Sequence, residues 1–264
     1  MIRFLDEPAD LLPIAAREPA LGAQLMDLAI VYHGDPLSAP IWLVCGGGGA
    51  PLGAVGTAGK NIIVLAEGMA PDAELSGFVR LLAGGDANGI LCGPRFAAVL
   101  KKQRDFRPVL RPVLKCSHAA EAPVCGLPVS PPRRLEDCWG LLAAESEEFA
   151  SSDKETWLLC VSRGIRRRQT TVLMVYDGDI PVSTASIRGR TENGGIIESV
   201  VTRPDHRGLG FASAIVAMLT DTLEAEERAA YIVSADDPSE RLYEKLGFEY
   251  CGELWHFVKT GDGE

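Results

Sequence analysis

GIIESVVTRPDHRGLGFASA, residues 195–214, is the stretch that decides the fold predicted for this chain. Its first part is apolar and β-branched, which favours a buried strand. Thr202 to Asp205 ends that strand, because proline cannot extend a ladder of hydrogen bonds and aspartate favours turns. A glycine-rich segment follows, Arg207 to Ala212, and the apolar positions after it predict a helix. The predicted order is therefore strand, turn, glycine-rich loop and helix.

A glycine-rich loop at the start of a helix is suited to binding an anion. The first turn of a helix presents backbone N–H groups without partners and a partial positive charge. Glycines let this backbone approach a ligand with no Cβ in the way. The segment therefore predicts a phosphate or pyrophosphate site, and Arg207 adds a cation that can pair with it.

The same residues resemble the signature of a known family. Arg207-x-x-Gly210-x-Ala212 is similar to the Arg/Gln-x-x-Gly-x-Gly/Ala motif of the GNAT superfamily of N-acetyltransferases. About one helix and one strand later, the segment from Ser239 to Phe248 resembles a second motif of that family. The order and spacing of the two segments are more specific than either alone. The resemblance covers the chain from about Leu127 to its C-terminus.

The residues around this stretch predict a mixed α/β fold. Asp177-Gly178-Asp179 between two apolar runs is a strong hairpin signal, and Asn193-Gly194-Gly195 predicts a second turn. The other predicted strands are Thr170 to Tyr176, Ile180 to Ile187, Ala230 to Ser234 and Glu253 to Val258. The other predicted helices are Arg134 to Phe149, Lys154 to Arg166 and one that carries Tyr243.

The first half of the chain predicts the same order of elements. Residues 40–115 predict strands, a helix, a strand, a helix and then short extended segments that Pro108 and Pro112 interrupt. The run from Gly46 to Gly49 predicts a hairpin turn, with a phosphate loop as the alternative. We therefore expect a degenerate GNAT-like domain over residues 1–115, with an unrelated α/β domain as the alternative. A linker over 116–132 and a catalytic GNAT domain over 133–264 complete the predicted organisation.

The composition limits the classes of function. The chain has 264 residues, 47% of them hydrophobic, enough for one large or two modest domains. Its net charge of −10 argues against a general nucleic-acid binder. The seven cysteines include no Cys-x-x-Cys pair, so we expect free thiols in a reducing cytosol and no metal site. No apolar run in residues 1–30 suits a signal peptide or a membrane span, which predicts a cytoplasmic protein without a membrane partner.

The resemblance implies a binding site for acetyl-CoA. The backbone of Arg207, Gly208, Leu209, Gly210, Phe211 and Ala212 would bind the pyrophosphate. In the family, the end of the preceding strand leaves its neighbour at a bulge and pairs with the pantetheine arm like an added strand. That role falls here to Val200, Val201 and Thr202, and a backbone N–H near Val200 would polarise the thioester carbonyl.

The resemblance also implies two catalytic side chains, Tyr243 and Glu198. Tyr243 would donate a proton to the departing thiolate, with a packed core aromatic as the alternative. Glu198 would act as the general base, and a structural or substrate-positioning carboxylate is an equal alternative. Strand alternation places Glu198 on the same face as Ile196 and Val200.

The sequence therefore predicts an acetyl-CoA-dependent N-acetyltransferase. It would transfer the acetyl group directly to a primary amine of a small molecule or peptide, within a ternary complex and without a metal. The predicted partners also include a second copy of the chain, in a homodimer. One rival is a non-catalytic sensor that binds acyl-CoA, and the other is an acyltransferase with a different acyl donor.

Overall fold

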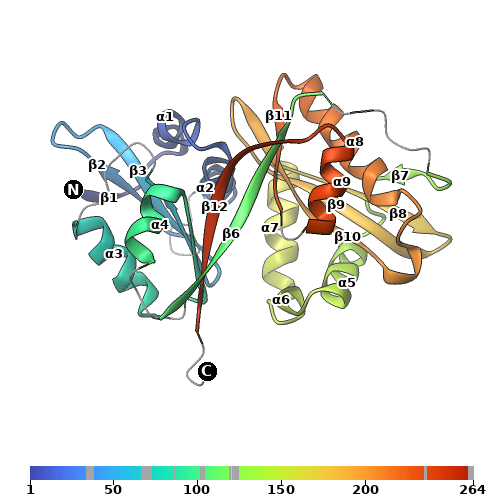
Figure 1. Cartoon of the computed structure of the whole chain (residues 1–264), viewed down its shortest axis with the longest axis horizontal. Coiled ribbons are helices and arrows are strands. Elements are labelled where there is room, and N and C mark those ends of the chain that lie inside the picture. The colour runs from blue at the N-terminus through green and yellow to red at the C-terminus, as the bar shows by residue number, and fades with distance from the viewer. Residues whose placement is uncertain are drawn as a thin grey trace. The chain divides into compact units, whose positions relative to one another are not determined.

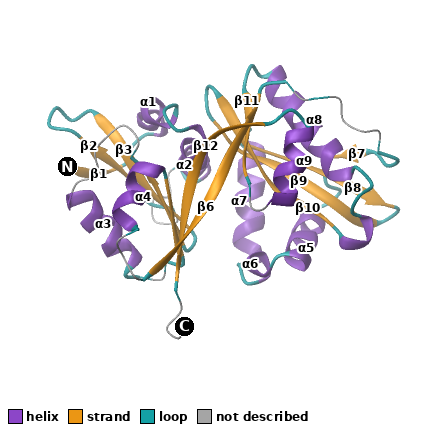
Figure 2. Cartoon of the chain, in the orientation of Figure 1, coloured by secondary structure: helices purple, strands orange, loops and turns teal. Residues whose placement is uncertain are grey.

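The computed structural model describes residues 1–33, 39–66, 73–85, 87–101, 105–118, 120, 125–234 and 237–260. The chain forms two compact units (Figure 1). Unit 1 comprises Met1–Val113 and Cys251–Glu264, and unit 2 comprises Leu114–Tyr250. Figure 2 shows that both units combine helices with strands, so the predicted mixed α/β fold is confirmed.

Unit 2 contains the sheet built around residues 195–214. Its strands lie in the order β7-β8-β9-β10-β11. They span Val129–Ser130, Thr170–Asp177, Ile180–Arg190, Gly194–Thr202 and Ala229–Val233. Neighbours from β7 to β10 are antiparallel, whereas β10 and β11 are parallel. Parallel neighbours need a crossover rather than a tight turn, and helix α8 (Phe211–Ala225) provides it.

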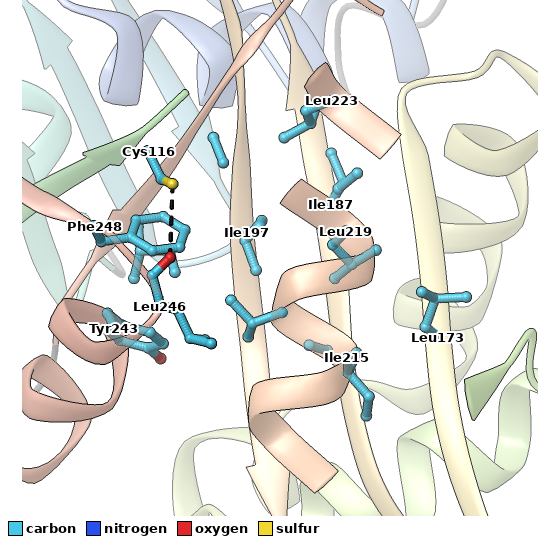
Figure 3. Close-up of a cluster of buried hydrophobic side chains, with 14 of the residues drawn as sticks. Cys116, Leu173, Ile187, Ile197, Ile215, Leu219, Leu223, Tyr243, Leu246 and Phe248 are labelled. Atoms are coloured by element: carbon cyan, nitrogen blue, oxygen red, sulfur yellow. Dashed lines mark hydrogen bonds between the residues drawn. The ribbon is translucent and has the colours of Figure 1, made fainter. Parts of the chain in front are cut away.

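Helix α8 covers one face of this sheet with a stripe of apolar side chains. Ile215, Leu219 and Leu223 are four residues apart, so they share one side of the helix. All three are fully buried, against Ile187 and Ile197 among other residues (Figure 3). Burial of each such side chain contributes about 1.5–3 kcal/mol relative to exposure. Helix α9 (Asp237–Lys245) brings Tyr243 into the same cluster.

Other helices form a second apolar cluster with this sheet. They are α5 (Leu135–Glu145), α6 (Glu147–Ala150) and α7 (Lys154–Arg166), and they connect β7 to β8. Leu142 of α5 and Val161 of α7 pack in a cluster with Met174 of β8. The sheet of unit 2 therefore has a core on each side, and β10 lies between the two.

Unit 1 repeats the pattern of unit 2. Its strands β1 (Ile2–Phe4), β2 (Ile41–Cys45), β3 (Pro51–Ala58), β4 (Asn61–Leu65) and β5 (Gly89–Cys92) lie side by side in that order. The first three pairs are antiparallel and the last is parallel, with α3 (Ala73–Ala83) as the crossover. Short helices η1 (Pro8–Leu11) and α1 (Leu12–Ala15) and the longer α2 (Pro19–Val31) connect β1 to β2, and α4 (Pro94–Leu100) follows β5. The predicted similarity of the two halves is confirmed in strand order and direction.

The last strand of the chain belongs mainly to unit 1. Strand β12 (Glu249–Lys259) pairs antiparallel with β5, with Trp255 opposite Cys92 and Phe257 opposite Ile90. From the sequence this strand is expected to complete the second half, because apolar alternation identifies a strand without identifying its neighbour. Phe257 is fully buried in the core of unit 1. The domain boundaries predicted from the sequence, 1–115 and 133–264, stay a prediction.

Two local predictions differ from the structure, in β6 and in the helix predicted over 134–149. Strand β6 (Phe106–Cys116) runs without a break through Pro108 and Pro112. These prolines are four residues apart, so both missing N–H groups fall on one edge of the strand and the other edge stays complete. The helix predicted over 134–149 breaks at Ser146, which caps α6. The predicted linker contains the short strand β7, and its residues 119 and 121–124 lie outside the described ranges.

The four-glycine run forms a hairpin turn, as predicted. It connects the antiparallel strands β2 and β3. The N–H of Gly46 donates to the carbonyl oxygen of Ala50, and the N–H of Gly49 donates to that of Gly46. The alternative of a phosphate loop at this turn is not needed to explain the glycines.

We predict that Phe257→Ala destabilises unit 1, although the residue lies near the C-terminus. Removing a buried Phe side chain costs about 3–5 kcal/mol, because its contacts are lost and a cavity remains. Hydrogen-exchange mass spectrometry should show lost protection in β4 and β5. The control is Tyr250→Ala, because Tyr250 lies on the same strand but is 63% exposed. Lost protection confined to β8 and β9 would contradict the pairing of β12 with β5.

Candidate active site

Strand β10 changes its pairing halfway along its length. Its parallel register with β11 runs from Gly194 to Ile196, which lies opposite Tyr231. Farther along, the register with β9 shifts between Glu198 and Val201, where two residues of β10 oppose one of β9. Ser199 in this bulge has a φ of 57°, which is uncommon for a residue with a side chain. The bulge therefore lies directly before the residues predicted to bind the pantetheine arm.

The bulge decides which way the side chains of β10 face. Val200 packs with the cluster that contains Ile197, below α8, whereas Val201 packs with the cluster of α5 and α7. Strict alternation would have put Ile197 and Val200 on opposite faces. The prediction that Glu198 shares a face with Val200 is therefore wrong. The extra residue at the bulge reverses the alternation after Glu198.

The glycine-rich loop has the backbone that its sequence predicts. A short 3₁₀ helix, η2 (Pro204–His206), follows β10. Gly208 and Gly210 have φ angles of 78° and 83°, a region that glycine adopts without a steric penalty. Gly210 is also the residue that precedes α8, and it supplies no side chain to cap the helix. The first N–H groups of α8 therefore receive no bond from a capping side chain at that position.

A cleft of about 780 Å³ lies between this loop, the end of β10 and helix α9. The predicted residues that line it are Val200, Val201, Thr202, Arg207, Gly208, Gly210, Phe211, Ala212 and Tyr243. Glu198 and Leu209 are not among the lining residues, and Leu209 is 56% exposed. The fold therefore brings together most of the predicted site from two segments of sequence.

Tyr243 is both a core residue and a lining residue of the cleft. Its side chain is only 6% exposed, and its ring centroid lies 6.0 Å from that of Phe248. Figure 3 shows the ring beside Leu246 and Phe248, at the end of the α9 helix. The two interpretations offered for this tyrosine do not exclude each other, because packing fixes a ring that also borders the cleft.

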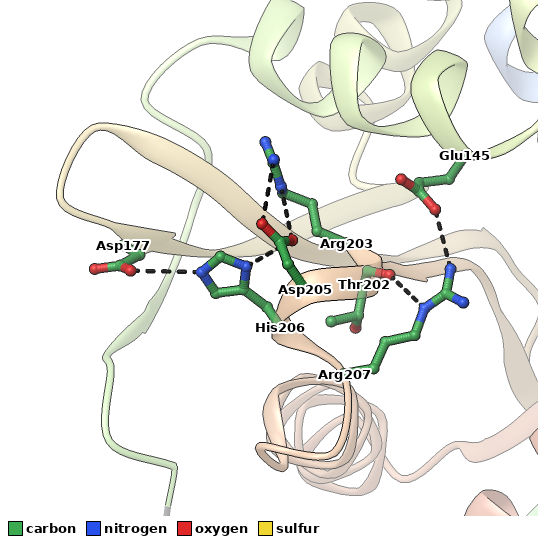
Figure 4. A network of polar contacts seen from close by, with 7 residues as sticks. All are labelled: Glu145, Asp177, Thr202, Arg203, Asp205, His206 and Arg207. Carbon is green, nitrogen blue, oxygen red and sulfur yellow. Dashed lines mark hydrogen bonds and ion pairs between the residues drawn. The ribbon is translucent and has the colours of Figure 1, made fainter.

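Arg207 already has protein partners. Its Nε donates to the carbonyl oxygen of Thr202 at 3.0 Å, and its Nη2 donates to Oε2 of Glu145, also at 3.0 Å (Figure 4). The Arg207 side chain is 62% exposed and that of Glu145 is 17% exposed. The guanidinium group predicted to pair with phosphate is therefore held by a carboxylate that lines the same cleft.

His206, another lining residue, lies between two carboxylates (Figure 4). Its Nδ1 is 2.9 Å from Asp205 and its Nε2 is 3.4 Å from Asp177. The hydrogen bond with Asp205, assisted by Asp177, raises the pKa of His206 above its ordinary 6.5. The hydrogen bonds from His206 and Arg203 lower the pKa of Asp205 from 3.8 to about 2. The loop therefore keeps a positive imidazole at a higher pH than a free histidine would.

Comparisons with known proteins identify the fold. Residues 182–256, from β9 to β12, match the family described as FR47-like protein. A GCN5-related N-acetyltransferase from Kribbella flavida superposes with a TM-score of 0.63 at 17% identity, covering 94% of this chain and 96% of that one. The chain has the GNAT fold. The resemblance stated from the sequence is thereby confirmed for the architecture.

Two further solved structures show that the GNAT fold extends over both units. A GCN5-related N-acetyltransferase from Sphaerobacter thermophilus has a TM-score of 0.64 at 19% identity, covering 99% of this chain and 96% of that one. A tandem GNAT protein from the clavulanic acid biosynthesis pathway has a TM-score of 0.55 at 14% identity, covering 99% of this chain and 100% of that one. Two GNAT-like halves in tandem are therefore the architecture of this chain. No curated protein sequence matches it.

Glu198 lies on β10 of the GNAT fold but outside the lining of the cleft. Its Oε1 is 3.9 Å from Nη1 of Arg188 on β9, and its side chain is 40% exposed. Its backbone oxygen accepts a hydrogen bond from Ser186 Oγ at 3.4 Å. The ion pair with Arg188 is compatible with a structural or substrate-positioning carboxylate. The role of Glu198 as general base stays a prediction.

Five further residues that line the cleft are not among those predicted from the sequence. They are Glu145, His206, Ser213, Ser239 and Leu242. His206 and Ser213 lie directly beside the first motif, and Ser239 and Leu242 lie within the second, so their places in the sequence could have indicated them. Glu145 stands 62 residues before Arg207, so no local pattern connects the two.

Neither a metal site nor a membrane span is found in the part of the chain that the structure describes. No three His, Cys, Asp or Glu side chains there are grouped so that they could hold a metal ion. No helix there has the length and apolar character needed to cross a membrane.

We predict that the His206 imidazole titrates above pH 6.5 and that Asp205→Asn lowers its pKa. The raised pKa means that protonated His206 stabilises the fold fully below pH 6.5, and that this contribution is lost as the pH rises through the folded-state pKa. The lowered pKa of Asp205 acts oppositely, with stability present above pH 3.8 and lost as the pH falls toward 2. NMR of the histidine ring measures the titration, and Asp179→Asn is the control. Equal pKa values in wild type and Asp205→Asn would contradict the interpretation.

Proposed function

We propose that this chain is an N-acyltransferase that moves an acetyl group from acetyl-CoA to a primary amine. The observation that supports it is the single cleft that joins the bulged end of β10, the glycine-rich loop and Tyr243. Each of these three features has a different task in acyl transfer. The amine would be that of a small molecule or a peptide, and no metal takes part in the proposed reaction.

The residues of the cleft fit coenzyme A. Its volume of about 780 Å³ is within the range of small-molecule sites, roughly 300–1,000 Å³. A Cβ at Gly208 would meet nothing within 4 Å, so the backbone there is open to a ligand. The start of α8 lacks a side-chain cap at Gly210 and offers N–H groups to an anion. These features favour a pyrophosphate beside Arg207, Gly208 and Gly210.

The end of β10 would hold the extended arm of the cofactor. Its parallel pairing with β11 runs from Gly194 to Ile196, so Val200 to Thr202 lie beyond that pairing. Backbone groups at such a divergence can pair with an extended ligand as a further strand would. A backbone N–H near Val200 would stabilise the negative charge that develops on the thioester oxygen. Acetyl-CoA, when bound, would supply the acetyl group as an activated thioester.

Two proton transfers would fall to side chains of this chain. The amine must lose a proton before it attacks, and Glu198 is the proposed base, directly or through water. The thiolate that leaves must be protonated or stabilised, and the Tyr243 hydroxyl is the proposed donor. Tyr243 is well suited to this task because its ring is fixed by packing while it borders the cleft.

The direct test is release of free thiol from acetyl-CoA in the presence of a panel of amines. Thiol release that depends on one amine class would support the proposal, and mass spectrometry of the acetylated amine would identify the product. Tight binding of coenzyme A without turnover of any amine would instead favour a sensor. Turnover only with a longer acyl donor would favour an acyltransferase of different donor specificity.

We predict that Gly210→Trp abolishes coenzyme A binding. The side chain would fill the loop that lines the cleft, and the positive φ would strain the backbone. Isothermal titration with coenzyme A measures the loss. The matched control is Gly178→Trp in the β8–β9 turn, which adds the same bulk at a φ of 59° and lies outside the lining residues. Normal affinity in folded Gly210→Trp would contradict the placement of the cofactor.

We predict that Tyr243→Phe lowers kcat about 100-fold, the loss expected for one general acid. Affinity for coenzyme A should stay within about twofold of wild type, because the ring and its packing are retained. Steady-state kinetics and titration separate the two effects. Tyr250→Phe is the control, since Tyr250 is exposed and lies outside the lining residues. An unchanged kcat would remove Tyr243 from the mechanism.

A further inference from the structure

Among the lining residues of the cleft that the structure describes, Glu145 is the one carboxylate. It is the last residue of α5 and reaches Arg207 across 3.0 Å, as Figure 4 shows. Its side chain is mostly buried, whereas that of Arg207 is mostly exposed. The cation of the proposed pyrophosphate site, Arg207, is therefore already paired with a carboxylate, that of Glu145.

This position is unfavourable for a carboxylate in three ways. The C-terminal end of a helix carries a partial negative charge, and the last turn of α5 contains no basic residue. Partial burial removes some of the water that would stabilise the charge. The cofactor proposed for the cleft brings further negative charge. Arg207 is the cation that offsets these effects in the structure.

We propose that Glu145 binds the positively charged amine of the acceptor, and that cofactor binding makes it available by taking Arg207 away. This inference rests on the proposed function. In the free protein, Glu145 and Arg207 neutralise each other. When a phosphate group of coenzyme A pairs with Arg207, the exposed guanidinium turns toward it and Glu145 is left without its cation.

The lining residues that the structure describes offer no substitute for Arg207. Within the described lining, His206 is the other residue that can carry a positive charge, and Asp205 and Asp177 both contact its ring. The released carboxylate is therefore best satisfied by a cation from outside the protein. An ammonium group on the acceptor supplies one, whereas an acceptor with a carboxylate or phosphate beside its amine would be repelled.

The exchange predicts that the cofactor and the acceptor bind with positive cooperativity. Because coupling between two binding sites is reciprocal, coenzyme A must strengthen amine binding by the same factor as the amine strengthens coenzyme A binding. Both effects pass through Glu145, so one substitution should remove both. It should also change the two affinities in opposite directions.

The first experiment titrates coenzyme A into Glu145→Gln. Glutamine keeps the size of the side chain but removes the charge that competes with phosphate. Coenzyme A should bind about two- to fivefold tighter than to wild type, the gain expected when a partly exposed ion pair no longer has to be broken. Glu147→Gln makes the same charge change two residues away on an exposed side chain outside the cleft, and should leave the affinity unchanged.

The second experiment measures the KM of the best amine from the thiol-release panel. Glu145→Gln should raise this KM at least about tenfold with kcat little changed, and Glu145→Asp should restore part of the loss. A residue with a merely structural role would weaken coenzyme A and amine binding together, and that result would overturn the inference. Unchanged coenzyme A affinity in Glu145→Gln would also overturn it.

Failure of the proposed function gives a different pattern. If wild-type protein does not bind coenzyme A, or if Gly210→Trp binds it normally, the cofactor site itself is wrong. If wild type binds coenzyme A at the loop but turns over no amine, the acceptor role of Glu145 is excluded. The coenzyme A titration would then still decide whether Glu145 competes for Arg207.

Discussion

The divergence of β10 from its parallel neighbour is the constraint on which the site depends. A strand within a sheet normally satisfies its backbone groups on both edges. The register of β10 with β11 ends at Ile196, and the bulge at Ser199 then shifts its register with β9. The cores on the two sides of the sheet hold this geometry, because Val200 is packed into one and Val201 into the other. The backbone between the bulge and the loop is thus fixed beside a cleft.

Charge in the cleft is balanced by pairs of residues rather than left as an open positive patch. Arg207 is paired with Glu145, and His206 is placed between Asp205 and Asp177. The chain as a whole carries a net charge of −10, so only local groups could attract the proposed phosphate ligand. Backbone N–H groups at the start of α8 would also attract an anion, and they do not depend on the protonation of a side chain.

The two units show how one strand pattern can serve different purposes. Both have three antiparallel pairs followed by a parallel pair with a helix as the crossover. Only unit 2 has the Arg-x-x-Gly-x-Ala motif at the start of that helix. Strand β12 places its apolar residues, including Phe257, in the core of unit 1. The strand that follows the Tyr243 helix therefore contributes to the stability of unit 1.

The sequence by itself determined the features that depend on near neighbours. The strand, turn and helix of residues 195–214 follow from local propensity, and Gly208 and Gly210 occupy positions with positive φ that glycine tolerates best. The spacing of the two motifs indicated that Tyr243 and the loop belong to one site. The tertiary structure alone decided the face of Val200, the pairing of β12 with β5, and the contact of Glu145 with Arg207. A bulge, a strand partner and a contact across 62 residues depend on how whole elements pack, and local patterns do not encode that packing.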